Sequence, residues 1–448
     1  MANTFLSKTL SGSPTDSNKW TWSAWVKRSK LTSEQVLFYA DDGGTNYYGR
    51  IQFHDTDEIS FRNKYASTNS GYAVTKAKFR DTSAWLHIVC VLDTSNSTAG
   101  DRMIIYVNGE RITEFDSFAA IDQNAGSTIN DGYQHRIGKG NATSGTSFFD
   151  GQMSHVHFID GQAYAPTVFG ETDATTGEWK IKTAVTATYG TNGFFILKDG
   201  NSVTDQSPNS NTFLNAGGTL TKTEDCPSNV FCNWNAANPF GGTLTNGNLT
   251  VGNSSSYDHN VQGSLGMTSG KYYWEIKMGG LNGEFGVCEQ GKAGQADPQG
   301  NIGFYFFYNN GTTTGYTWNN ATASGSATTS TITAFSNGMI LGIAYDADNK
   351  NFYVHQNGVY VNSGDPTSGA SATGALITNL YPRFGGTIVP FMGWGASEAR
   401  TNFSANFGNG FFGTTEISSA GTNASGIGRF EYNVPTGYTS LSTKGLNL

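Results

Sequence analysis

The sequence predicts an all-β protein made of two antiparallel β-sandwiches in series. Residues 85–115 give the first indication, because two apolar, β-branched runs, Trp85–Leu92 and Met103–Val107, are separated by a polar stretch. The second run ends at Asn108-Gly109, and Asn-Gly between two such runs is a strong hairpin signal, since both residues tolerate positive φ. The same meander recurs in residues 339–361, again with an Asn-Gly turn. A chain that carries this meander twice is expected to hold two sandwiches.

Length and composition agree with this fold class. At 448 residues the chain is too long for one ordinary core, and 57 glycines with 13% aromatic residues fit a protein rich in turns and strands. The net charge is −8 and the 27 Lys and Arg residues are scattered, so nucleic acid is not expected as a partner. The longest apolar run is too short to span a bilayer, so membrane insertion is not expected either.

The first sandwich is expected to begin after a polar extension, residues 1–18, which has no core of its own and is the expected attachment to a larger assembly. Residues 20–26 alternate, with Trp20 and Trp22 on one face of a strand. Further strands follow about every ten residues with turns between them and no helical period, which is typical of a sandwich. These strands are expected at Val36–Tyr39, Tyr48–Phe53, Ile59–Asn63, Arg136–Gly138 and Gly151–Phe158, together with the meander.

Five segments of this part carry a family resemblance. WTWSAWVKR, WLHIVCVLD, IIYVNGERI, RIGKG and FFDGQMSHVHFIDGQAY occur in the order seen in the laminin-G-like, concanavalin-type lectin and glucanase sandwich. The resemblance covers about residues 18–170, and the final aromatic strand ending in Asp-Gly is its most specific part. It implies a curved, two-sheet antiparallel jelly roll, a fold that mostly binds glycans or proteins.

The second half carries a different resemblance. Strands are expected at Leu244–Val251, in GKYYWEIKM, at Gly283–Cys288 and in the second meander, followed by LYPRFGG and ANFGNGFFG. These pieces are similar to the SPRY sandwich over about residues 242–415, which implies a module that binds partners and is not an enzyme. The expected domains are an extension (1–18), a laminin-G-like sandwich (19–185), a linker region (186–240) and a SPRY-like sandwich with a C-terminal tail (241–448).

The combination of the two halves resembles the virion appendage proteins, often tail fibre-like, of marine tailed bacteriophages. FIDGQAY, FGETDATTGEWK and the late PTGYTSL carry this resemblance. It implies a non-enzymatic structural and binding protein that recognises a host-surface glycan or protein, contacts other virion proteins and forms a homo-oligomer, commonly a trimer. The N-terminus has no apolar core or cleavage site of a signal peptide, so assembly into a virion in the host cytoplasm is the expected localisation.

Two alternative functions remain open: a depolymerase of host envelope polysaccharide, and a capsid decoration or joining protein. A glycan hydrolase needs two carboxylates about 5–9 Å apart across one sugar. The nearest sequence string runs from Glu171 to Glu178, but its spacing does not place carboxylates on alternate positions of one strand, and Gly177 indicates a turn. We therefore expect a solvated loop and no catalytic residues. A correctly spaced carboxylate pair would favour the depolymerase.

Calcium is the one cofactor that the sequence leaves open. Asp55, Asp57 and Glu58 lie in the string HDTDE, and the resemblance to laminin-G-like domains, which often bind calcium, makes them candidates. Residues 346–351 (DADNKN) resemble the start of a calcium loop but lack its Gly at the sixth position and its Glu at the twelfth. Asp and Asn also close hairpin turns by side-chain hydrogen bonds, which is the interpretation we favour for this segment.

The histidines and cysteines give no metal site. His155 and His157 alternate on one expected strand, but no third ligand is identifiable, and we expect two surface histidines. Cys226 and Cys232 flank PSNVF and could pair, although reduced thiols are expected in a protein without a secretion signal. No serine-hydrolase, zinc-protease or phosphate-loop motif is present.

Four aromatic residues in expected loops are the candidate ligand-binding residues. Sugars bind by stacking their apolar faces on Trp and Tyr rings while polar side chains bind the hydroxyls. Tyr47 and Tyr48 occur in GGTNYYG, and Tyr316 and Trp318 occur in GTTTGYTWNN. Packing over a sandwich end is the alternative for all four. Aromatic residues within strands, such as Trp22, Trp85, Trp274 and Phe304, are expected in the cores.

Overall fold

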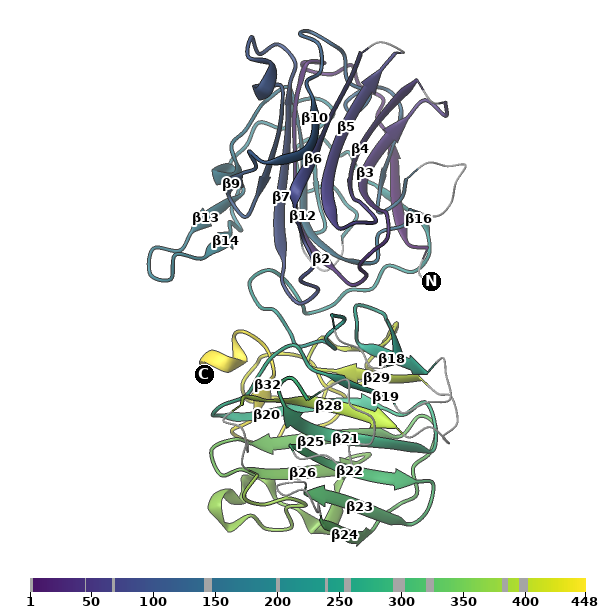
Figure 1. Cartoon of the computed structure of the whole chain (residues 1–448), viewed down its shortest axis with the longest axis vertical. Helices are drawn as coiled ribbons and strands as arrows, with labels where there is room; N and C mark the ends of the chain where they lie inside the picture. The colour runs from purple at the N-terminus through teal and green to yellow at the C-terminus, as the bar shows by residue number, and fades with distance from the viewer. Residues whose placement is uncertain are drawn as a thin grey trace. The chain divides into compact units, whose positions relative to one another are not determined.

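A computed structural model describes most of the chain, and its contacts divide it into two compact units, Met1–Lys222 and Thr223–Leu448 (Figure 1). The described residues are 3–44, 46–66, 69–140, 147–198, 202–237, 241–253, 259–292, 303–319, 326–380, 386–394 and 402–448. Both units are built of antiparallel strands, with only 3-10 turns as helices in these ranges. No helix in the described ranges has the length and apolar character needed to cross a membrane. The all-β fold class is confirmed.

The first unit is a sandwich of two sheets. One sheet has the order β10 (Phe115–Ala119), β6 (Asn69–Lys78), β5 (Glu58–Tyr65), β4 (Tyr47–Phe53), β3 (Gln35–Asp41), β11 (Gln134–Ile137), β1 (Phe5–Thr9) and β16 (Leu214–Gly217). The other has the order β15 (Phe194–Ile196), β12 (Gly151–Asp160), β2 (Lys19–Arg28), β7 (Leu86–Asp93), β8 (Met103–Val107) and β9 (Glu110–Arg111). A separate hairpin joins β13 (Gly170–Thr172) and β14 (Trp179–Ile181). Short 3-10 turns lie at Ala99–Asp101 and Pro166–Val168.

Aromatic side chains fill the space between the two sheets of the first unit. Trp20 and Trp22 alternate on β2 and are fully buried, as the alternation predicted. The Trp20 indole donates to Ser127 Oγ at 2.8 Å, so its polar nitrogen is satisfied inside the core. Phe38 stacks on Trp22 from the opposite sheet.

Asp160 explains why the strand that ends the predicted first sandwich is followed by Asp-Gly. Its buried carboxylate accepts hydrogen bonds from the Thr15 amide (2.8 Å), the Asn130 side-chain amide (2.7 Å) and the Asn192 amide (3.0 Å). Gly161 follows with φ of 85°, a conformation that favours glycine. One side chain therefore holds three loops that are far apart in the sequence.

Residues 1–18 were expected to form a separate extension, but the described part of this segment, residues 3–18, includes a strand of the first unit. Residues Phe5–Thr9 form β1 inside the larger sheet, where Leu6 pairs with Ile137 on one side and Asn215 on the other. Leu6 is buried in the core. The segment was missed because a strand of five residues with one inward apolar residue gives almost no periodic signal.

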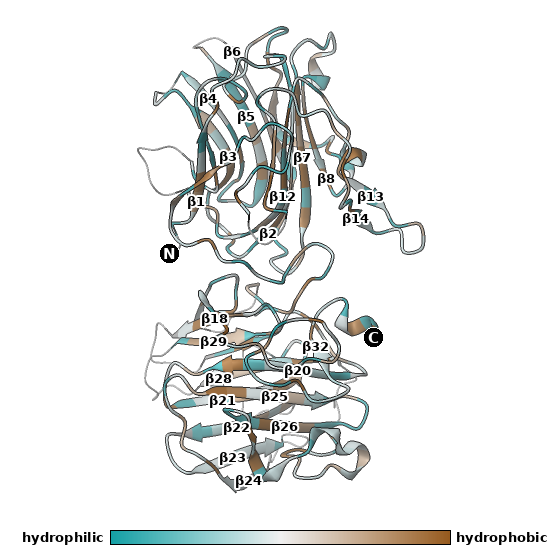
Figure 2. Cartoon of the chain, turned by 180° about the vertical axis from the view of Figure 1, so that it is seen from behind, coloured by the Kyte–Doolittle hydropathy of each residue, from teal (hydrophilic) through white to brown (hydrophobic). Residues whose placement is uncertain are grey.

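The second unit is also a sandwich. One sheet has the order β17 (Gly242–Thr245), β18 (Thr250–Asn253), β29 (Asn402–Asn406), β20 (Lys271–Lys277), β25 (Ile340–Asp346), β26 (Asn351–Gln356) and β27 (Val359–Tyr360), and β32 (Thr439–Ser440) pairs in parallel with β20. The other has the order β19 (His259–Gln262), β28 (Ile388–Trp394), β21 (Asn282–Glu289), β22 (Phe304–Asn310), β23 (Thr314–Asn319) and β24 (Ser326–Thr331). A short hairpin joins β30 (Phe411–Phe412) and β31 (Thr415–Glu416), and 3-10 turns lie at Val361–Ser363, Pro366–Ser371 and Gly445–Asn447. Hydrophobic residues recur along strands of both units, for example on β7, β21 and β28 (Figure 2).

The expected linker, residues 186–240, belongs to the two units instead. Its first part forms β15 and β16, and Phe213 is buried in the first core. Its last part places Cys232 and Trp234 in the second core. The division falls between Lys222 and Thr223. The turn-rich composition of this segment therefore reflects irregular chain that packs on the two units. It does not indicate a flexible linker.

Two further expectations in the second unit need comment. The single strand expected at Leu244–Val251 is a hairpin, β17 and β18, whose turn contains Asn246 and Gly247 with φ of 54° and 72°. Most of the strand expected in LYPRFGG, residues 381–385, lies outside the described residues.

Both Asn-Gly turns take the conformation that the sequence predicted. Asn108 and Gly109 have φ of 48° and 85°, and Asn357 and Gly358 have φ of 47° and 90°. In each unit the asparagine side chain also extends the sheet: Asn108 Oδ1 accepts from the His87 amide at 2.8 Å, and Asn357 Oδ1 accepts from the Ile340 amide at 2.8 Å. The meanders are thus equivalent in detail in both units.

A buried glutamate connects the C-terminal segment to the second sandwich. Glu275 on β20 accepts hydrogen bonds from the Glu431 amide (2.9 Å), the Tyr432 amide (2.8 Å), the Tyr273 hydroxyl (3.0 Å) and the Asn406 side-chain amide (3.3 Å). Burial raises the pKa of Glu275 to about 7, while these donors act to lower it. The C-terminal segment is therefore part of the folded unit.

Acid is expected to destabilise the first unit more than the second. Burial lowers the pKa of His87 to about 3 and that of His135 to about 4, and both lie in the first unit. Because their folded pKa values lie below the ordinary 6.5, the stability they confer is present above pH 6.5 and is lost as the pH falls toward 4, by about 2 kcal/mol per histidine at pH 5. In the second unit His355, with a pKa of about 4, acts in the same direction.

Glu275 opposes this loss in the second unit. Since its folded pKa is raised, its proton is bound more tightly in the folded state, and acidification from pH 7 to 4.5 adds stability. Amide hydrogen exchange of the whole chain at pH 7 and pH 5, corrected for intrinsic rates, should show a larger loss of protection in residues 3–222. A larger loss in the second unit would contradict the prediction.

Candidate binding face

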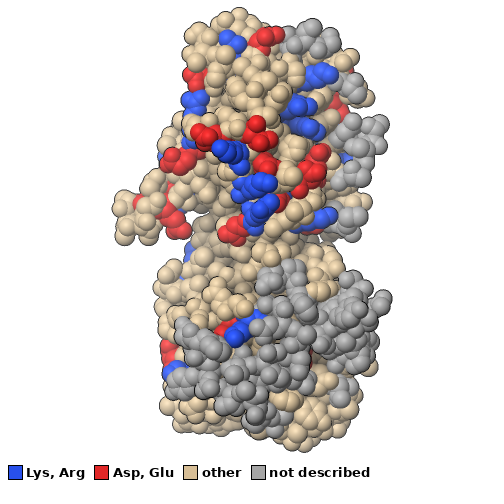
Figure 3. Space-filling view, viewed as in Figure 1, with Lys and Arg blue, Asp and Glu red and all other residues tan. Residues whose placement is uncertain are grey.

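The outer face of the large sheet in the first unit carries alternating tyrosines and cations. The inward residues of β4 and β5, such as Ile51 and Phe61, lie in the core, so their neighbours point outward. The register then aligns the outward residues in rows across the strands. We name this surface the cation–tyrosine face and define it by Tyr39, Asp41, Tyr48, Arg50, Gln52, Arg62, Lys64, Tyr72 and Arg136. Lys and Arg side chains gather over these strands in Figure 3.

The tyrosines of this face lie against the cations. The Arg62 guanidinium lies 5.1 Å from the centre of the Tyr72 ring and donates to Tyr48 Oη at 3.1 Å. The Lys64 ammonium lies 5.9 Å from the Tyr48 ring, and both sides of the pair are half-buried. These distances are typical of cation–π interactions. Such contacts restrict the positions of the long, flexible Arg and Lys side chains.

Two carboxylates share the face with the cations. Asp41 accepts from Arg136 Nη1 at 3.2 Å, and both side chains are buried. Burial, reinforced by Asp41, raises the pKa of the adjacent Tyr39. Glu34 lies 3.8 Å from Arg50 at the edge of the face. The face therefore carries both positive and negative charges.

Several polar atoms beneath this face lack a partner. In the described part of the chain, neither side-chain atom of the fully buried Gln52 makes a hydrogen bond. Arg50 Nε and Asp41 Oδ2 on the same face are likewise buried and unpaired within those residues. Buried polar groups are normally satisfied, so a group of three such residues on one sheet face needs an explanation.

The four candidate aromatic residues lie in strands, not in loops. Tyr47 and Tyr48 begin β4, and as neighbours in a strand they point to opposite faces. Tyr47 packs edge-on against Tyr65, with ring centres 5.1 Å apart, over the end of the sandwich. Only Tyr48 lies on the cation–tyrosine face, so the two tyrosines do not form one site.

The other two candidates share one face of β23 in the second unit. Tyr316 lies 6.2 Å from Tyr308, and Trp318 stacks at 6.4 Å on Phe306. Both are half-buried, and Trp318 packs against a cluster that contains Phe391. Phe304 in the same cluster, and Trp22, Trp85 and Trp274 elsewhere, are buried as expected.

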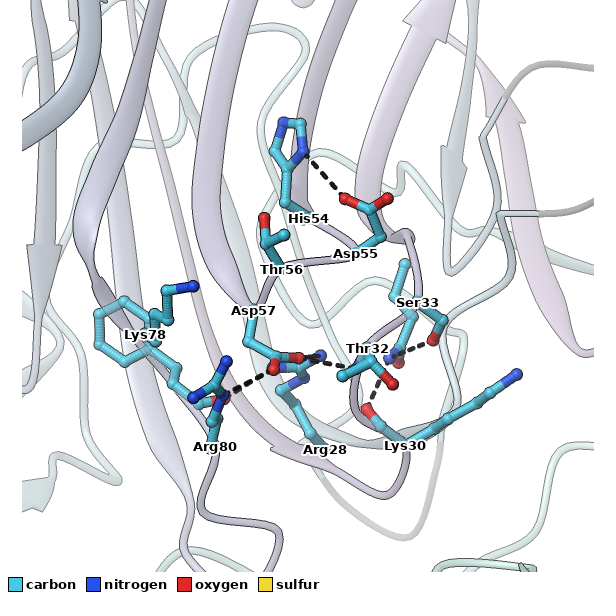
Figure 4. A network of polar contacts seen from close by, with 12 residues as sticks. Arg28, Lys30, Thr32, Ser33, His54, Asp55, Thr56, Asp57, Lys78 and Arg80 are labelled. Carbon is cyan, nitrogen blue, oxygen red and sulfur yellow. Dashed lines mark hydrogen bonds and ion pairs between the residues drawn. The ribbon is translucent and has the colours of Figure 1, made fainter.

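The candidate calcium residues are engaged with other groups. Asp57 is fully buried and accepts from Arg28 Nη2 (3.0 Å), Arg80 Nε (2.9 Å) and the Thr32 amide (2.8 Å), as Figure 4 shows. Burial alone would raise the pKa of Asp57, but the amide and the two guanidinium groups hold it below its ordinary value. Glu58 pairs with Lys78 at 3.2 Å. Both carboxylates thus have cationic partners of their own.

The turn at residues 346–351 connects β25 and β26, as the favoured interpretation predicted. Asp346 accepts from the Asn349 amide at 2.9 Å and pairs with Lys271 Nζ at 2.9 Å. Asp348 accepts from the Gly270 amide. Among the described residues, no group of three His, Cys, Asp or Glu side chains is arranged to hold a metal ion.

The two histidines of β12 do not alternate on the strand surface. His155 has φ of 50° and lies in a bulge of β12, which interrupts the regular alternation. His157 is buried, bonds to Tyr189 Oη at 2.8 Å and stacks on Phe195 at 3.9 Å. The expectation of two surface histidines is therefore wrong for His157. Cys226 and Cys232 are not joined in a disulfide.

The carboxylates between Glu171 and Glu178 lie on an exposed hairpin. Glu171 on β13 lies 3.5 Å from Lys180 Nζ, and Asp173 lies 3.1 Å from the same atom. Asp173 also accepts from the Thr175 and Thr176 amides, which lowers its pKa to about 2. The expected solvated turn is present, and two of its three carboxylates, those of Glu171 and Asp173, share one lysine.

Residues 7–169 match a family model described as the concanavalin A-like lectin/glucanases superfamily. No curated protein matches the chain. Among solved structures, the chain is similar to the SPRY domain of human HERC1, with 14% identity over 38% of this chain and 96% of that one and a TM-score of 0.30. It is also similar to mouse laminin alpha1 domains LG4-5, with 9% identity and a TM-score of 0.30. This alignment covers 90% of this chain and 84% of the laminin chain. The sandwich architecture itself is established by the strands and registers described above.

Proposed function

We propose that the chain is a non-enzymatic structural and binding protein of a phage particle, a tail fibre or another appendage, that recognises a host-surface glycan or protein. The match of residues 7–169 to a lectin-type family model supports the binding role. The combined sandwiches and the C-terminal segment resemble phage appendage proteins. This resemblance supports the proposal that the protein is part of a virion. The observation that carries the binding role is the cation–tyrosine face, an outward surface rich in aromatic and hydrogen-bonding side chains.

The non-enzymatic part of the proposal rests on the acidic residues. Lys180 engages Glu171 and Asp173, so neither carboxylate lies ready to protonate a glycosidic oxygen. We also propose a homo-oligomer with three-fold symmetry that contacts other virion proteins, because weak single-site binding gains from multivalency. Calcium binding at the HDTDE loop remains a proposal for which Asp57 would have to exchange its arginine partners. Attachment to the particle through the N-terminal segment would have to involve a chain in which β1 is already part of the sheet.

Purified protein is expected to bind polysaccharide extracted from the host envelope and to release no reducing ends from it. Retention of the protein on immobilised polysaccharide measures the first part, and a reducing-sugar assay measures the second. Release that is abolished by Glu171→Gln or Glu178→Gln would instead establish the depolymerase. Antibody labelling of virions should mark the tail or its appendages, whereas even labelling of the capsid would establish a decoration protein.

A further inference from the structure

We propose that the cation–tyrosine face binds an acidic polysaccharide, a polymer of sugars that carry carboxylate or sulfate groups. This inference rests on the proposed binding function and specifies the ligand class and the site. Three independent features of the face point to such a ligand: two arginines placed opposite each other, cations held by tyrosine rings, and unpaired polar atoms at its base.

The first feature is a pair of like charges in direct register. Arg50 on β4 and Arg62 on β5 are paired residues of adjacent antiparallel strands and point to the same side. Directly opposed like charges destabilise a sheet. Glu34 lies near Arg50 at 3.8 Å, on a side chain that is 41% exposed, and no carboxylate is recorded within ion-pair distance of Arg62 in the described residues. An anionic group between the two guanidinium groups would remove the repulsion and accept charge-assisted hydrogen bonds from both.

The second feature is the preorganisation of these cations. Arg62 is held between the ring of Tyr72 and the hydroxyl of Tyr48, and the Lys64 ammonium lies near the ring of Tyr48. A cation that is already ordered loses less conformational entropy when it binds an anion. The paired residues continue from Tyr72 through Arg62 and Arg50 to Tyr39. With adjacent strands about 4.8 Å apart, this row spans roughly 14 Å, which suits a chain more than a single ion.

The third feature is the set of unmet hydrogen bonds. Gln52 is two residues along β4 from Arg50 and therefore on the same face, and both of its side-chain atoms are buried without a partner in the described chain. Arg50 Nε is a second unmet donor there. An amide can both donate to and accept from a sugar hydroxyl. Hydroxyls and acidic groups on one polymer would match these unmet atoms and the neighbouring cations together.

The test uses the full chain, with dextran sulfate and polygalacturonate as acidic probes and uncharged dextran as the neutral probe. Calorimetry at 0.15 M salt should show binding of at least one acidic probe and none of dextran. The double variant Arg50→Gln/Arg62→Gln should weaken that binding at least tenfold without lowering the thermal midpoint, because it also removes the repulsion. Gln52→Leu should weaken binding and raise the midpoint, since it removes an unpaired buried amide. Arg111→Gln, an exposed arginine of the same unit, is the matched control and should change affinity less than twofold.

Three results would overturn the inference: no binding of either acidic probe, equal binding by the double variant and the control, or equally tight binding of single-stranded DNA, which would indicate a general affinity for polyanions. If the chain binds host envelope polysaccharide but neither acidic probe, only this inference fails. If it binds no polysaccharide at all, the glycan-binding part of the proposed function fails with it.

Discussion

Changing Asp57 to alanine is expected to lower the free energy of unfolding of the first unit by about 3–5 kcal/mol, because removing one partner of a buried ion pair leaves the other charge uncompensated. Arg28 is fully buried and, among the described residues, would keep its hydrogen bond to the Phe79 carbonyl and its contact with the Phe53 ring. The Thr32 amide would also lose its acceptor. Urea unfolding, followed by hydrogen exchange in residues 3–222, measures the loss in this unit.

Asp55 provides the matched control for this prediction. It lies two residues earlier, its side chain is 73% exposed, and its recorded ion pair is with His54 at 3.8 Å. Asp55→Ala should change the free energy of unfolding by less than about 0.5 kcal/mol. Similar losses in the two variants, or a loss below about 1 kcal/mol for Asp57→Ala, would show that the buried network does not stabilise the unit.

Changing Glu275 to leucine is expected to destabilise the second unit by about 3–5 kcal/mol, since each buried donor left without an acceptor costs about 1–3 kcal/mol and the site can relax only in part. Four donors from β20, β29 and the C-terminal segment lose their acceptor in this variant. Because two of the donors are the amides of Glu431 and Tyr432, the C-terminal segment should lose its exchange protection first. Hydrogen exchange at pH 8, where the carboxylate is ionised, measures both effects.

Two variants sharpen the interpretation. Glu275→Gln keeps one acceptor oxygen but points an N–H donor toward a backbone amide. Its loss of unfolding free energy should therefore be smaller than that of Glu275→Leu but greater than zero. Glu416→Ala removes an exposed carboxylate that pairs with Arg429 and should cost less than about 1 kcal/mol. If leucine and glutamine behave alike, or if protection is lost evenly over the whole unit, the carboxylate does not hold the C-terminal segment.

Local signals predicted the parts of the fold that depend on local physics. The two Asn-Gly turns adopt positive φ in both residues, and the alternation in residues 20–26 gave the correct inward face. β6 was missed because its inward residues include Ala73 and Thr75, which are too small or polar to produce an apolar alternation. Residues 186–240 were assigned to a linker because irregular packed chain and free chain have the same turn-rich composition.

The candidate site was predicted only in part, since it depends on register. Tyr48 lies on the cation–tyrosine face, but its partners Arg62 and Tyr72 come from strands whose alignment no local pattern specifies. A weak signal was present: in YYGRIQF the second, fourth and sixth residues are polar or amphipathic, which is the pattern of a solvated strand face. The sequence left the calcium candidates open because a carboxylate that binds a metal and one that binds buried arginines look alike in sequence.

The position of β1 has a consequence for how the chain folds as it is synthesised. Leu6 pairs with Ile137 and with Asn215, so neither neighbour of β1 exists until more than a hundred further residues have been made. At about 5–20 residues per second, the wait for β11 is roughly 6–26 s and that for β16 roughly 10–42 s. The meander at β7–β9 can form locally long before this, because loop closure over short distances is fast. The nascent chain therefore carries an unpaired N-terminal strand with free edges during this interval, and unpaired edges are where strands of neighbouring chains associate.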